Sequence, residues 1–450
     1  MTVSRDVQSV SDSSDGALRT AAVIAVGSEL LGEDRLDTNS LRIAGLLADF
    51  GIELRLKIVV GDEVADLVAA LESAARKVDL IFMTGGLGPT QDDLTREAVA
   101  AWSGSELVLD EDVLAWIEEM YRRRGRRMPE PNRRQAEVLT GATVLRNERG
   151  TAPGLLLAAQ ETTVFLLPGV PLEVDGLIET EVRPWLEQHA AGARWSTLEV
   201  KTACVPESRV EELLAPIYER WGAGAVAVLA KPGQVMVRLR HQEAEELQRA
   251  ESEVVQALGD VLFSRSLDGP AADLEEVVLG RLDLAKQTLA VAESCTGGGL
   301  GARLTNVPGS SRSFLGGVIS YSNELKLEAL GVDAEALEEH GAVSAEVASQ
   351  MALGARSRCG ADWAVAITGI AGPGGGSAEK PVGTVWFGLA GPGVGARELV
   401  TSEHGLFPGD RTRVRQQATQ YALDMLRRAL FGLEPLRWDD ILVSSGDVAR

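Results

Sequence analysis

A serine and a cysteine stand side by side in the segment TLAVAESCTGGG, which covers residues 288–299. The first residues of this segment are apolar and β-prone, and its glycines open a helical pattern. We therefore expect Ser294 and Cys295 at a strand-to-helix turn, beside the unpaired N–H groups of the helix. The chemistry that this arrangement offers is nucleophilic catalysis.

A serine hydroxyl needs a base, and the next apolar strand ends in SYSNELK, residues 320–326. Lys326 can accept a proton only when neutral, which requires its pKa to fall from about 10.4 to roughly 7–8, a difference of about 4 kcal/mol. Tyr321 could relay the proton, or hold Lys326 and Ser294 in register. The N–H groups of residues 295–297 could stabilise a developing oxyanion.

Other residues compete for these roles. Cys295 is intrinsically the better nucleophile as a thiolate. The favoured interpretation is that Cys295 packs under the turn as a small apolar residue. Ser294 could also be a helix cap, and Lys380 competes with Lys326 for the role of base.

Two further C-terminal segments could bind a phosphorylated substrate. Residues 369–377 (GIAGPGGGS) follow an apolar strand and suit a phosphate or ribose cradle, a lid, or a plain surface connection. Arg411 and Arg415 precede the helical pattern of residues 416–430. Either arginine could neutralise a phosphate, although arginines that open a helix are commonly just exposed.

The N-terminal half has its own candidate site in TGGLGPTQDDLT, residues 84–95, directly after an apolar strand. Glycines at the carboxyl end of a strand let backbone N–H groups approach a phosphate. Asp92 and Asp93 could hold Mg²⁺, or could simply cap the helix that follows. Asp37 adds a polar group ahead of an earlier helix, where helix capping is the simpler interpretation.

The sequence around these segments alternates strand-like and helix-like patterns, and these elements must position the candidate residues. Such alternation predicts a mostly parallel sheet covered by helices over residues 20–190, closed by a helix over 172–188. A small α+β unit follows over 191–270, with strands expected at 197–204 and 234–240 and helices at 208–220 and 243–258. A third region, 271–433, is again α/β, with tails at 1–19 (disordered) and 434–450. The predicted fold class is therefore two three-layer α/β domains joined by a small α+β domain.

Bulk composition excludes several classes of function. The net charge of −22 over 450 residues argues against nucleic acid as a partner, and we expect the basic run 122–127 to be a solvated helix end. Three scattered cysteines indicate reduced thiols, and four histidines without metal spacing make zinc improbable. No apolar run is long enough to span a bilayer, and no signal peptide is recognisable, so we expect a cytoplasmic protein without a membrane partner.

Together the motifs resemble the competence-damage-inducible CinA family over nearly all of residues 20–433. The resemblance is carried by IAVGSELLGEDRLDTNS (24–40), TGGLGPTQDDLT (84–95), LPGVPLE (167–173), AESCTGG (292–298), VISYSNELK (318–326), HGAVS (340–344), ITGIAGPGGGS (367–377), KPVGTVWFG (380–388) and FPGDR (407–411). The first loop, GSELLGED, departs from the family in the place of its second glycine, and CVPESRVEE stands where relatives tend to have glycines.

For the C-terminal domain the resemblance implies nicotinamide-nucleotide amidase activity, as in the PncC enzymes of NAD salvage, with no cofactor. These enzymes are NMN deamidases, which convert nicotinamide mononucleotide and water to nicotinate mononucleotide and ammonia. The resemblance makes Ser294 the nucleophile and Tyr321 and Lys326 its activating partners. The implied substrate contacts are Thr296, Gly297, Gly298, Gly369, Ile370, Ala371, Gly372 and Arg411.

For the N-terminal domain the resemblance implies the MogA/MoaB molybdopterin-binding type of fold, with ADP-ribose pyrophosphatase activity that depends on a divalent metal such as Mg²⁺. Asp92 and Asp93 would hold the metal. The implied substrate contacts are Asp37, Thr84, Gly85, Gly86, Gly88, Pro89 and Thr90.

The middle segment resembles the family's KH-like insert, but lacks the GxxG clamp with which KH modules hold RNA. We interpret it as a spacer or a dimer element, and we expect a homodimer that binds nucleotide substrates and no nucleic acid. Two alternatives stay open at this point. The protein could bind molybdopterin, or bind a partner in competence, without turning over a substrate.

Overall fold

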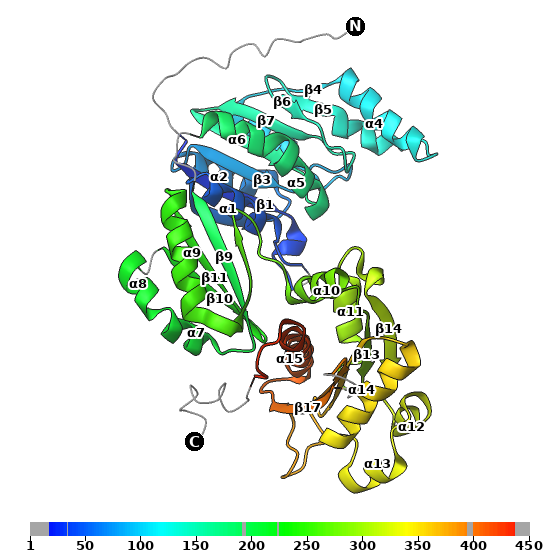
Figure 1. The fold of residues 1–450 in the computed structure, drawn as a ribbon. Coiled ribbons are helices and arrows are strands. Elements are labelled where there is room, and N and C mark those ends of the chain that lie inside the picture. The colour runs from blue at the N-terminus through cyan, green and yellow to red at the C-terminus, as the bar shows by residue number, and fades with distance from the viewer. Residues whose placement is uncertain (1–17, 34, 191–194, 223–224, 394–398, 437–450) are drawn as a thin grey trace. The chain divides into compact units, whose positions relative to one another are not determined.

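The computed structural model describes residues 18–33, 35–190, 195–222, 225–393 and 399–436 (Figure 1). Of the two predicted tails, residues 1–17 and 437–450 lie outside the described residues. The chain divides into two compact units, residues 1–195 and 196–450. The domain boundaries inferred from the sequence stay predictions. Within the described ranges, no helix has the length and apolar character that crossing a membrane requires.

The first unit is an α/β domain around a six-stranded sheet. Its strands lie in the order β2 (Glu53–Val60), β1 (Thr20–Val26), β3 (Leu80–Thr84), β8 (Thr162–Leu167), β7 (Gly154–Ala159) and β6 (Thr143–Leu145). The first four run parallel, and the last two continue the sheet antiparallel. A separate antiparallel pair consists of β4 (Leu107–Leu109) and β5 (Glu137–Leu139).

Helices cover both faces of this sheet because its central strands are apolar on both sides. In β1, Ala21 and Val23 belong to one core, while Ala22 and Ile24 belong to the core on the other face. The first core is closed by α1 (Asn39–Asp49), α5 (Pro171–Leu177) and α6 (Arg183–His189). The second is closed by α2 (Val64–Ala75), α3 (Thr95–Ser103) and α4 (Glu111–Arg123). Short 3-10 turns lie at Ser28–Leu30 and Glu130–Ala136.

The helix predicted over residues 172–188 is present, and the helical backbone runs without interruption from Pro171 to His189. A π-helical turn, Ile178–Val182, separates α5 from α6. Pro184 lies at the start of α6 and cannot donate a backbone hydrogen bond into the preceding turn, which is consistent with the altered hydrogen bonding there.

The second unit begins with a four-stranded antiparallel sheet. Its strands lie in the order β10 (Val226–Lys231), β11 (Gln234–His241), β9 (Ser196–Ala203) and β12 (Leu262–Leu267). One face is covered by α7 (Glu207–Leu213), α8 (Ala215–Trp221) and α9 (Ala244–Leu258), and a 3-10 turn, Gly259–Val261, precedes β12. The sequence predicted only two of these strands, because glycine and alanine around residues 222–227 hid β10. The single helix predicted over 208–220 is interrupted at Leu214, two residues before Pro216.

The rest of the second unit is another three-layer α/β domain. Its strands lie in the order β14 (Phe314–Ile319), β13 (Leu289–Glu293), β15 (Trp363–Gly369), β16 (Thr384–Gly391) and β17 (Leu399–Leu406). The first three run parallel and the last two antiparallel. One core contains α10 (Leu274–Ala285), α11 (Gly299–Thr305) and α15 (Arg411–Phe431). The other face is covered chiefly by α14 (Ala345–Cys359), with α12 (Asn323–Leu330) and α13 (Ala334–His340) beside it. A 3-10 turn, Ser310–Arg312, precedes β14. The predicted fold class is confirmed.

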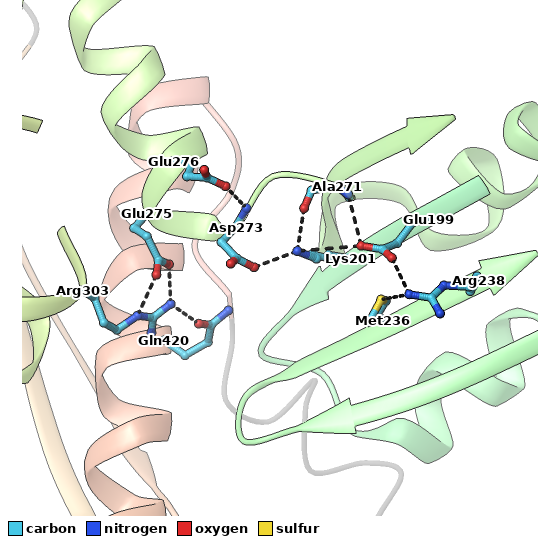
Figure 2. A network of polar contacts seen from close by, with 10 residues as sticks. All are labelled: Glu199, Lys201, Met236, Arg238, Ala271, Asp273, Glu275, Glu276, Arg303 and Gln420. Atoms are coloured by element: carbon cyan, nitrogen blue, oxygen red, sulfur yellow. Dashed lines mark hydrogen bonds and ion pairs between the residues drawn. The ribbon is translucent and has the colours of Figure 1, made fainter. Parts of the chain in front are cut away.

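Polar side chains tie the four-stranded sheet to the C-terminal helices, as Figure 2 shows. The buried Lys201 amine donates to the Ala271 carbonyl oxygen at 2.6 Å and to an Asp273 carboxylate oxygen at 2.7 Å. Glu199 accepts from the Ala271 N–H at 3.1 Å and from Arg238 at 2.9 Å. Because Asp273 also caps α10, these contacts fix the start of that helix on the sheet.

We expect Lys201→Ala to lower the free energy of unfolding by about 2 kcal/mol, because the Ala271 carbonyl and the Glu199 carboxylate lose their buried partner. Urea denaturation followed by circular dichroism measures this change. Lys231→Ala is the matched control, since Lys231 lies exposed on the same sheet. Equal stability of the two variants would contradict the prediction.

Candidate functional site

Ser294 follows β13 directly, at the carboxyl edge of the C-terminal sheet. Its backbone N–H donates to the Ile367 carbonyl oxygen of β15 at 2.9 Å, and the residue is 8% exposed. The chain then turns sharply into α11 through Gly297 and Gly298, whose φ angles of 59° and 93° are left-handed and favour glycine. The predicted strand-to-helix turn is present, with the serine at its start.

Lys326 lies in the first turn of α12, which is capped by the Ser322 side chain. Its amine is 3.3 Å from the Ser294 hydroxyl oxygen, although the two residues are 32 positions apart. The same amine donates to the carbonyl oxygens of Ser320 at 2.8 Å, Tyr321 at 3.4 Å and Ser322 at 3.5 Å. Lys326 is 1% exposed. These three carbonyl groups surround the amine, which faces the serine.

Burial lowers the pKa of Lys326 below its ordinary value, because the interior disfavours the charged ammonium. No carboxylate forms an ion pair with this amine in the described part of the chain, although the charge of Glu324 acts against the effect of burial. A neutral amine keeps two N–H groups for the carbonyl oxygens, of which that of Ser320 at 2.8 Å is the nearest, and one lone pair for the hydroxyl of Ser294. The geometry therefore suits a base for that hydroxyl.

The N–H groups that could bind an oxyanion are fewer than predicted. Gly297 donates its N–H to the Ser294 carbonyl oxygen at 3.0 Å, so it is not available to a substrate. The N–H groups of Cys295 and Thr296 have no acceptor within the described ranges. These two donors directly follow the nucleophile, which is a common arrangement of an oxyanion hole.

Tyr321 does not occupy the place that the sequence suggested. Its ring is 60% exposed, and its hydroxyl accepts a hydrogen bond from Arg411 at 2.9 Å. Among the described residues, that hydroxyl has no hydrogen bond to Ser294 or Lys326. Tyr321 contacts the lysine through its backbone carbonyl instead, while the hydroxyl of its exposed side chain binds Arg411. Its predicted role as a direct proton relay has no support in this geometry.

Two arginines at the start of α15 flank the turn. Arg411 donates to the Gly372 carbonyl oxygen at 3.0 Å as well as to Tyr321. Arg415 donates to the Thr296 carbonyl oxygen at 2.7 Å. Thr296 is fully buried, and its hydroxyl has no partner among the described residues. The arginines bring positive charge to a site that lacks a metal cluster in the described residues, which suits an anionic substrate.

The glycine loop after β15 lies at the same sheet edge as Ser294. Gly369 ends the strand. The N–H of Ile370 donates to the Thr384 carbonyl oxygen, and the Ile370 carbonyl oxygen accepts from the Gly383 N–H at 2.7 Å. Ala371 is buried, and Gly372 has a left-handed φ of 81°. The start of this loop is thus fixed to β16 rather than a free lid.

The two alternative catalytic groups, the Cys295 thiol and the Lys380 amine, have other surroundings. Cys295 is 5% exposed and packs in the core with α11 and α15. Burial raises the pKa of its thiol to about 12, so a thiolate is disfavoured near neutral pH. The Lys380 amine donates to the His340 carbonyl oxygen at 2.6 Å, not to Ser294.

In the first unit, a pocket of about 400 Å³ opens at the carboxyl ends of β1, β3 and β8. All the residues predicted for this site line it: Asp37, Thr84, Gly85, Gly86, Gly88, Pro89, Thr90, Asp92 and Asp93. Gly85 has a φ of 104°, and a side chain there would collide with the Val26 carbonyl oxygen. The N–H groups of Gly86 and Leu87 have no acceptor within the described ranges, so the loop can still offer both to a phosphate.

Asp93 organises this loop. Its carboxylate accepts from the N–H groups of Gly88 at 2.7 Å and Thr90 at 2.8 Å, and from the Thr90 hydroxyl at 2.5 Å. The predicted alternative, a cap of the following helix, does not describe these contacts, because α3 has no side-chain cap and Asp93 binds the loop that precedes it. Asp92 is exposed, and the nearby Thr90 hydroxyl lowers the pKa of its carboxyl group. Asp37 accepts from the Ser40 N–H at 3.0 Å and pairs with Lys57 at 3.1 Å.

The pocket carries far more negative than positive charge. Among the described residues, its lining contains six carboxylates and one arginine, Arg35; the carboxylates are Glu29, Asp37, Asp62, Asp92, Asp93 and Glu173. The described residues nevertheless contain no group of three or more acidic, histidine or cysteine side chains placed to hold an ion by themselves. The residues therefore fit a cation that takes most of its ligands from water and a bound diphosphate, with Asp92 as a lining carboxylate that forms no ion pair among the described residues.

Two buried residues that touch these sites were not predicted. Arg96 is 2% exposed and donates to the carbonyl oxygens of Leu87 at 3.1 Å and Gly88 at 3.2 Å, beneath the glycine loop. Arg96 lies at the polar start of a helix, and nothing in that sequence context indicated that the residue would be buried. Glu293 is 1% exposed and immediately precedes Ser294. An acidic residue at the end of an apolar strand was a usable signal, because a buried carboxylate must find donors.

Comparison with known families gives three matches along the chain. Residues 22–188 match the family described as probable molybdopterin binding domain, residues 198–264 match the damage-inducible protein CinA KH domain, and residues 271–430 match the CinA C-terminal domain.

Full-length relatives match as well. The chain is 42% identical to a CinA-like protein of Solibacter usitatus, over 92% of this chain and 98% of the relative. It is 43% identical to a putative competence-damage inducible protein of Caldicellulosiruptor bescii, over 91% of this chain and 99% of the relative. Among solved structures, the competence/damage inducible protein CihA from Agrobacterium tumefaciens is 40% identical, covering 35% of this chain and 93% of its own, with a TM-score of 0.33.

Proposed function

Because the chain belongs to the CinA family, we propose that it is a hydrolase of pyridine-nucleotide salvage with two separate active sites. The C-terminal site converts nicotinamide mononucleotide and water to nicotinate mononucleotide and ammonia. One observation carries this proposal. A buried lysine amine, which has no carboxylate partner among the described residues, lies 3.3 Å from the hydroxyl oxygen of a serine at a strand-to-helix turn.

In the first half of the reaction, the neutral Lys326 amine takes the proton of the Ser294 hydroxyl. The serine oxygen then attacks the carboxamide carbon, and the oxyanion that forms faces the N–H groups of Cys295 and Thr296. Lys326 returns the proton to the amide nitrogen. The C–N bond breaks, ammonia leaves, and an ester links nicotinate to Ser294.

In the second half, water attacks this ester while Lys326 accepts one of its protons. The C–O bond to Ser294 breaks, the proton returns to the serine oxygen, and the carboxylic acid product leaves as nicotinate mononucleotide. Arg411 and Arg415 supply the positive charge for the phosphate of the substrate. No cofactor takes part in this scheme.

Ammonia release from nicotinamide mononucleotide by the purified protein tests the proposal, with formation of nicotinate mononucleotide followed by chromatography. Nicotinamide riboside, which lacks the phosphate, is the matched control substrate, and we expect it to react poorly. Absence of ammonia release would favour the alternative in which the chain binds a partner in competence without turnover.

For the N-terminal site we propose hydrolysis of ADP-ribose to AMP and ribose 5-phosphate with a divalent cation. The N–H groups of Gly86 and Leu87 would bind phosphate oxygens, and Arg96 adds buried positive charge beneath the loop. A diphosphate would enter a pocket that is predominantly acidic, so its charge needs a cation such as Mg²⁺, bound beside Asp92. The cation would polarise the pyrophosphate.

We expect removal of divalent cations to lower ADP-ribose hydrolysis by at least roughly tenfold, because the acidic pocket then repels the diphosphate. The measurement is AMP formation with EDTA and after addition of excess Mg²⁺. Ammonia release by the C-terminal site in the same sample is the internal control and should not change. Full hydrolysis in EDTA would contradict the prediction, and molybdopterin binding without hydrolysis would favour the binding-protein alternative.

The remaining proposals concern the setting of the protein. We propose a cytoplasmic homodimer with nucleotide substrates and without nucleic-acid or membrane partners. All three cysteines are unpaired thiols, which suits a reducing compartment.

A further inference from the structure

Glu293 is the last residue of β13 and directly precedes the proposed nucleophile. Its carboxylate points into the turn that follows and accepts three backbone hydrogen bonds. One oxygen accepts from Gly298 at 3.1 Å and Leu300 at 3.0 Å, and the other accepts from Gly301 at 2.8 Å. With 1% exposure, the residue has little access to water that could replace these donors.

These contacts close a ring around Ser294. The carboxylate before the serine holds the residues after it, so the turn from 293 to 301 is fixed at both ends by one side chain. Hydrogen bonds to a carboxylate are stronger than those between neutral groups, and they strengthen in a dry interior. Arg415 fixes the middle of the same turn through the Thr296 carbonyl oxygen.

The ring also decides which N–H groups remain for a substrate. The donors of Gly298, Leu300 and Gly301 are occupied by Glu293, while those of Cys295 and Thr296 stay without an acceptor among the described residues. A turn that relaxed would move both of these donors and the serine hydroxyl relative to Lys326.

We propose that Glu293 is a positioning residue of the C-terminal site, which holds the Ser294 hydroxyl against Lys326 and aims the Cys295 and Thr296 N–H groups at the oxyanion. The inference rests on the proposed role of Ser294 as nucleophile. Glu293 itself touches neither substrate nor the reacting atoms in this scheme. Its effect is on the geometry of the groups that do.

The test is Glu293→Gln, which keeps the shape of the side chain but turns an NH2 group toward backbone donors. We expect kcat for ammonia release to fall about 100-fold, the scale of a misplacement near 1 Å, while KM changes little. The rate at which a fluorophosphonate probe labels Ser294 should fall in parallel, because labelling needs the same alignment but no nicotinamide substrate.

Asp362→Asn is the matched control. Its carboxylate accepts from the Thr288 N–H at 2.8 Å and from the Thr288 hydroxyl at 2.9 Å, at the opposite end of β13. That end lies five residues away, roughly 16 Å along a strand. This variant should lose thermal stability as Glu293→Gln does, yet keep kcat and the labelling rate.

Unchanged kcat and labelling in folded Glu293→Gln would overturn the inference, as would an equal loss of kcat in Asp362→Asn. Should Glu293→Gln fail to fold, Glu293→Asp decides, since it keeps the charge and retracts it by roughly 1.5 Å; an intermediate loss of labelling is expected. A wild-type protein that labels at Ser294 but releases no ammonia refutes the proposed substrate while labelling still tests Glu293. A wild type that does not label overturns both.

Discussion

Ser294→Ala is expected to reduce ammonia release from nicotinamide mononucleotide by at least roughly 10³-fold, because no covalent ester can form without the serine oxygen. Binding of the substrate should persist, since Arg411, Arg415 and the glycine loop are untouched. Steady-state kinetics measures the first effect and calorimetric titration the second. The fold should be unaffected, because the serine hydroxyl contacts only the Lys326 amine in the described structure.

Cys295→Ala is the matched control for this variant, since it removes the neighbouring and chemically stronger nucleophile. The buried thiol packs in the core, and burial raises its pKa to about 12, so its loss should cost some stability and little activity. The reverse pattern, with activity lost in Cys295→Ala and kept in Ser294→Ala, would move the nucleophile to the cysteine.

The sequence predicted the central strands well because their signal is strong and local. Strands β1, β3 and β13 are continuous apolar runs bounded by polar residues and glycine, which is typical of strands buried on both faces. Two strands of the small sheet escaped prediction. Strand β10 is an edge strand with exposed residues and alanines, so its alternation was weak, and its place depends on pairing with β11.

The candidate nucleophile and base could be paired from the sequence because each ends a parallel strand. Ser294 follows β13 and Lys326 lies just beyond β14, and neighbouring parallel strands bring their carboxyl ends to one edge. The role of the Tyr321 side chain could not be predicted in the same way. Which way a side chain turns at a strand end depends on its local partners, here Arg411 from a helix 90 residues away.

The roles of the two aspartates in the N-terminal loop show a further limit. Spacing alone allowed Asp93 to be a metal ligand or a cap, since both need a carboxylate beside a glycine loop. The structure places its oxygens on the N–H groups of Gly88 and Thr90, which only the folded loop brings together. The contact of Arg96 with the loop could not be predicted for the same reason, because the burial of an arginine beneath a loop depends on tertiary structure.

Lys326→Met is expected to abolish ammonia release as fully as Ser294→Ala, while stabilising the fold near neutral pH. Methionine fills the space of the lysine stem without a charged group to bury. Burial lowers the pKa of Lys326 in the folded protein relative to the unfolded chain. Between these two pKa values the unfolded chain binds more protons, so the wild-type free energy of unfolding rises with pH across that window. Below the window the full burial cost remains, and Lys326→Met removes it.

The activity of the wild type should follow the same titration. We expect kcat/KM to rise with pH through the lowered pKa of Lys326 and then level off, with the rise lying below the range of an ordinary lysine near 10.4. Lys380→Met is the matched control, since its amine bonds the His340 carbonyl oxygen, and it should keep both the activity and the rise. If Lys380→Met removed the rise and Lys326→Met kept it, the base would be Lys380. Loss of both the activity and the rise in Lys326→Met alone would assign the base to the buried amine that faces Ser294.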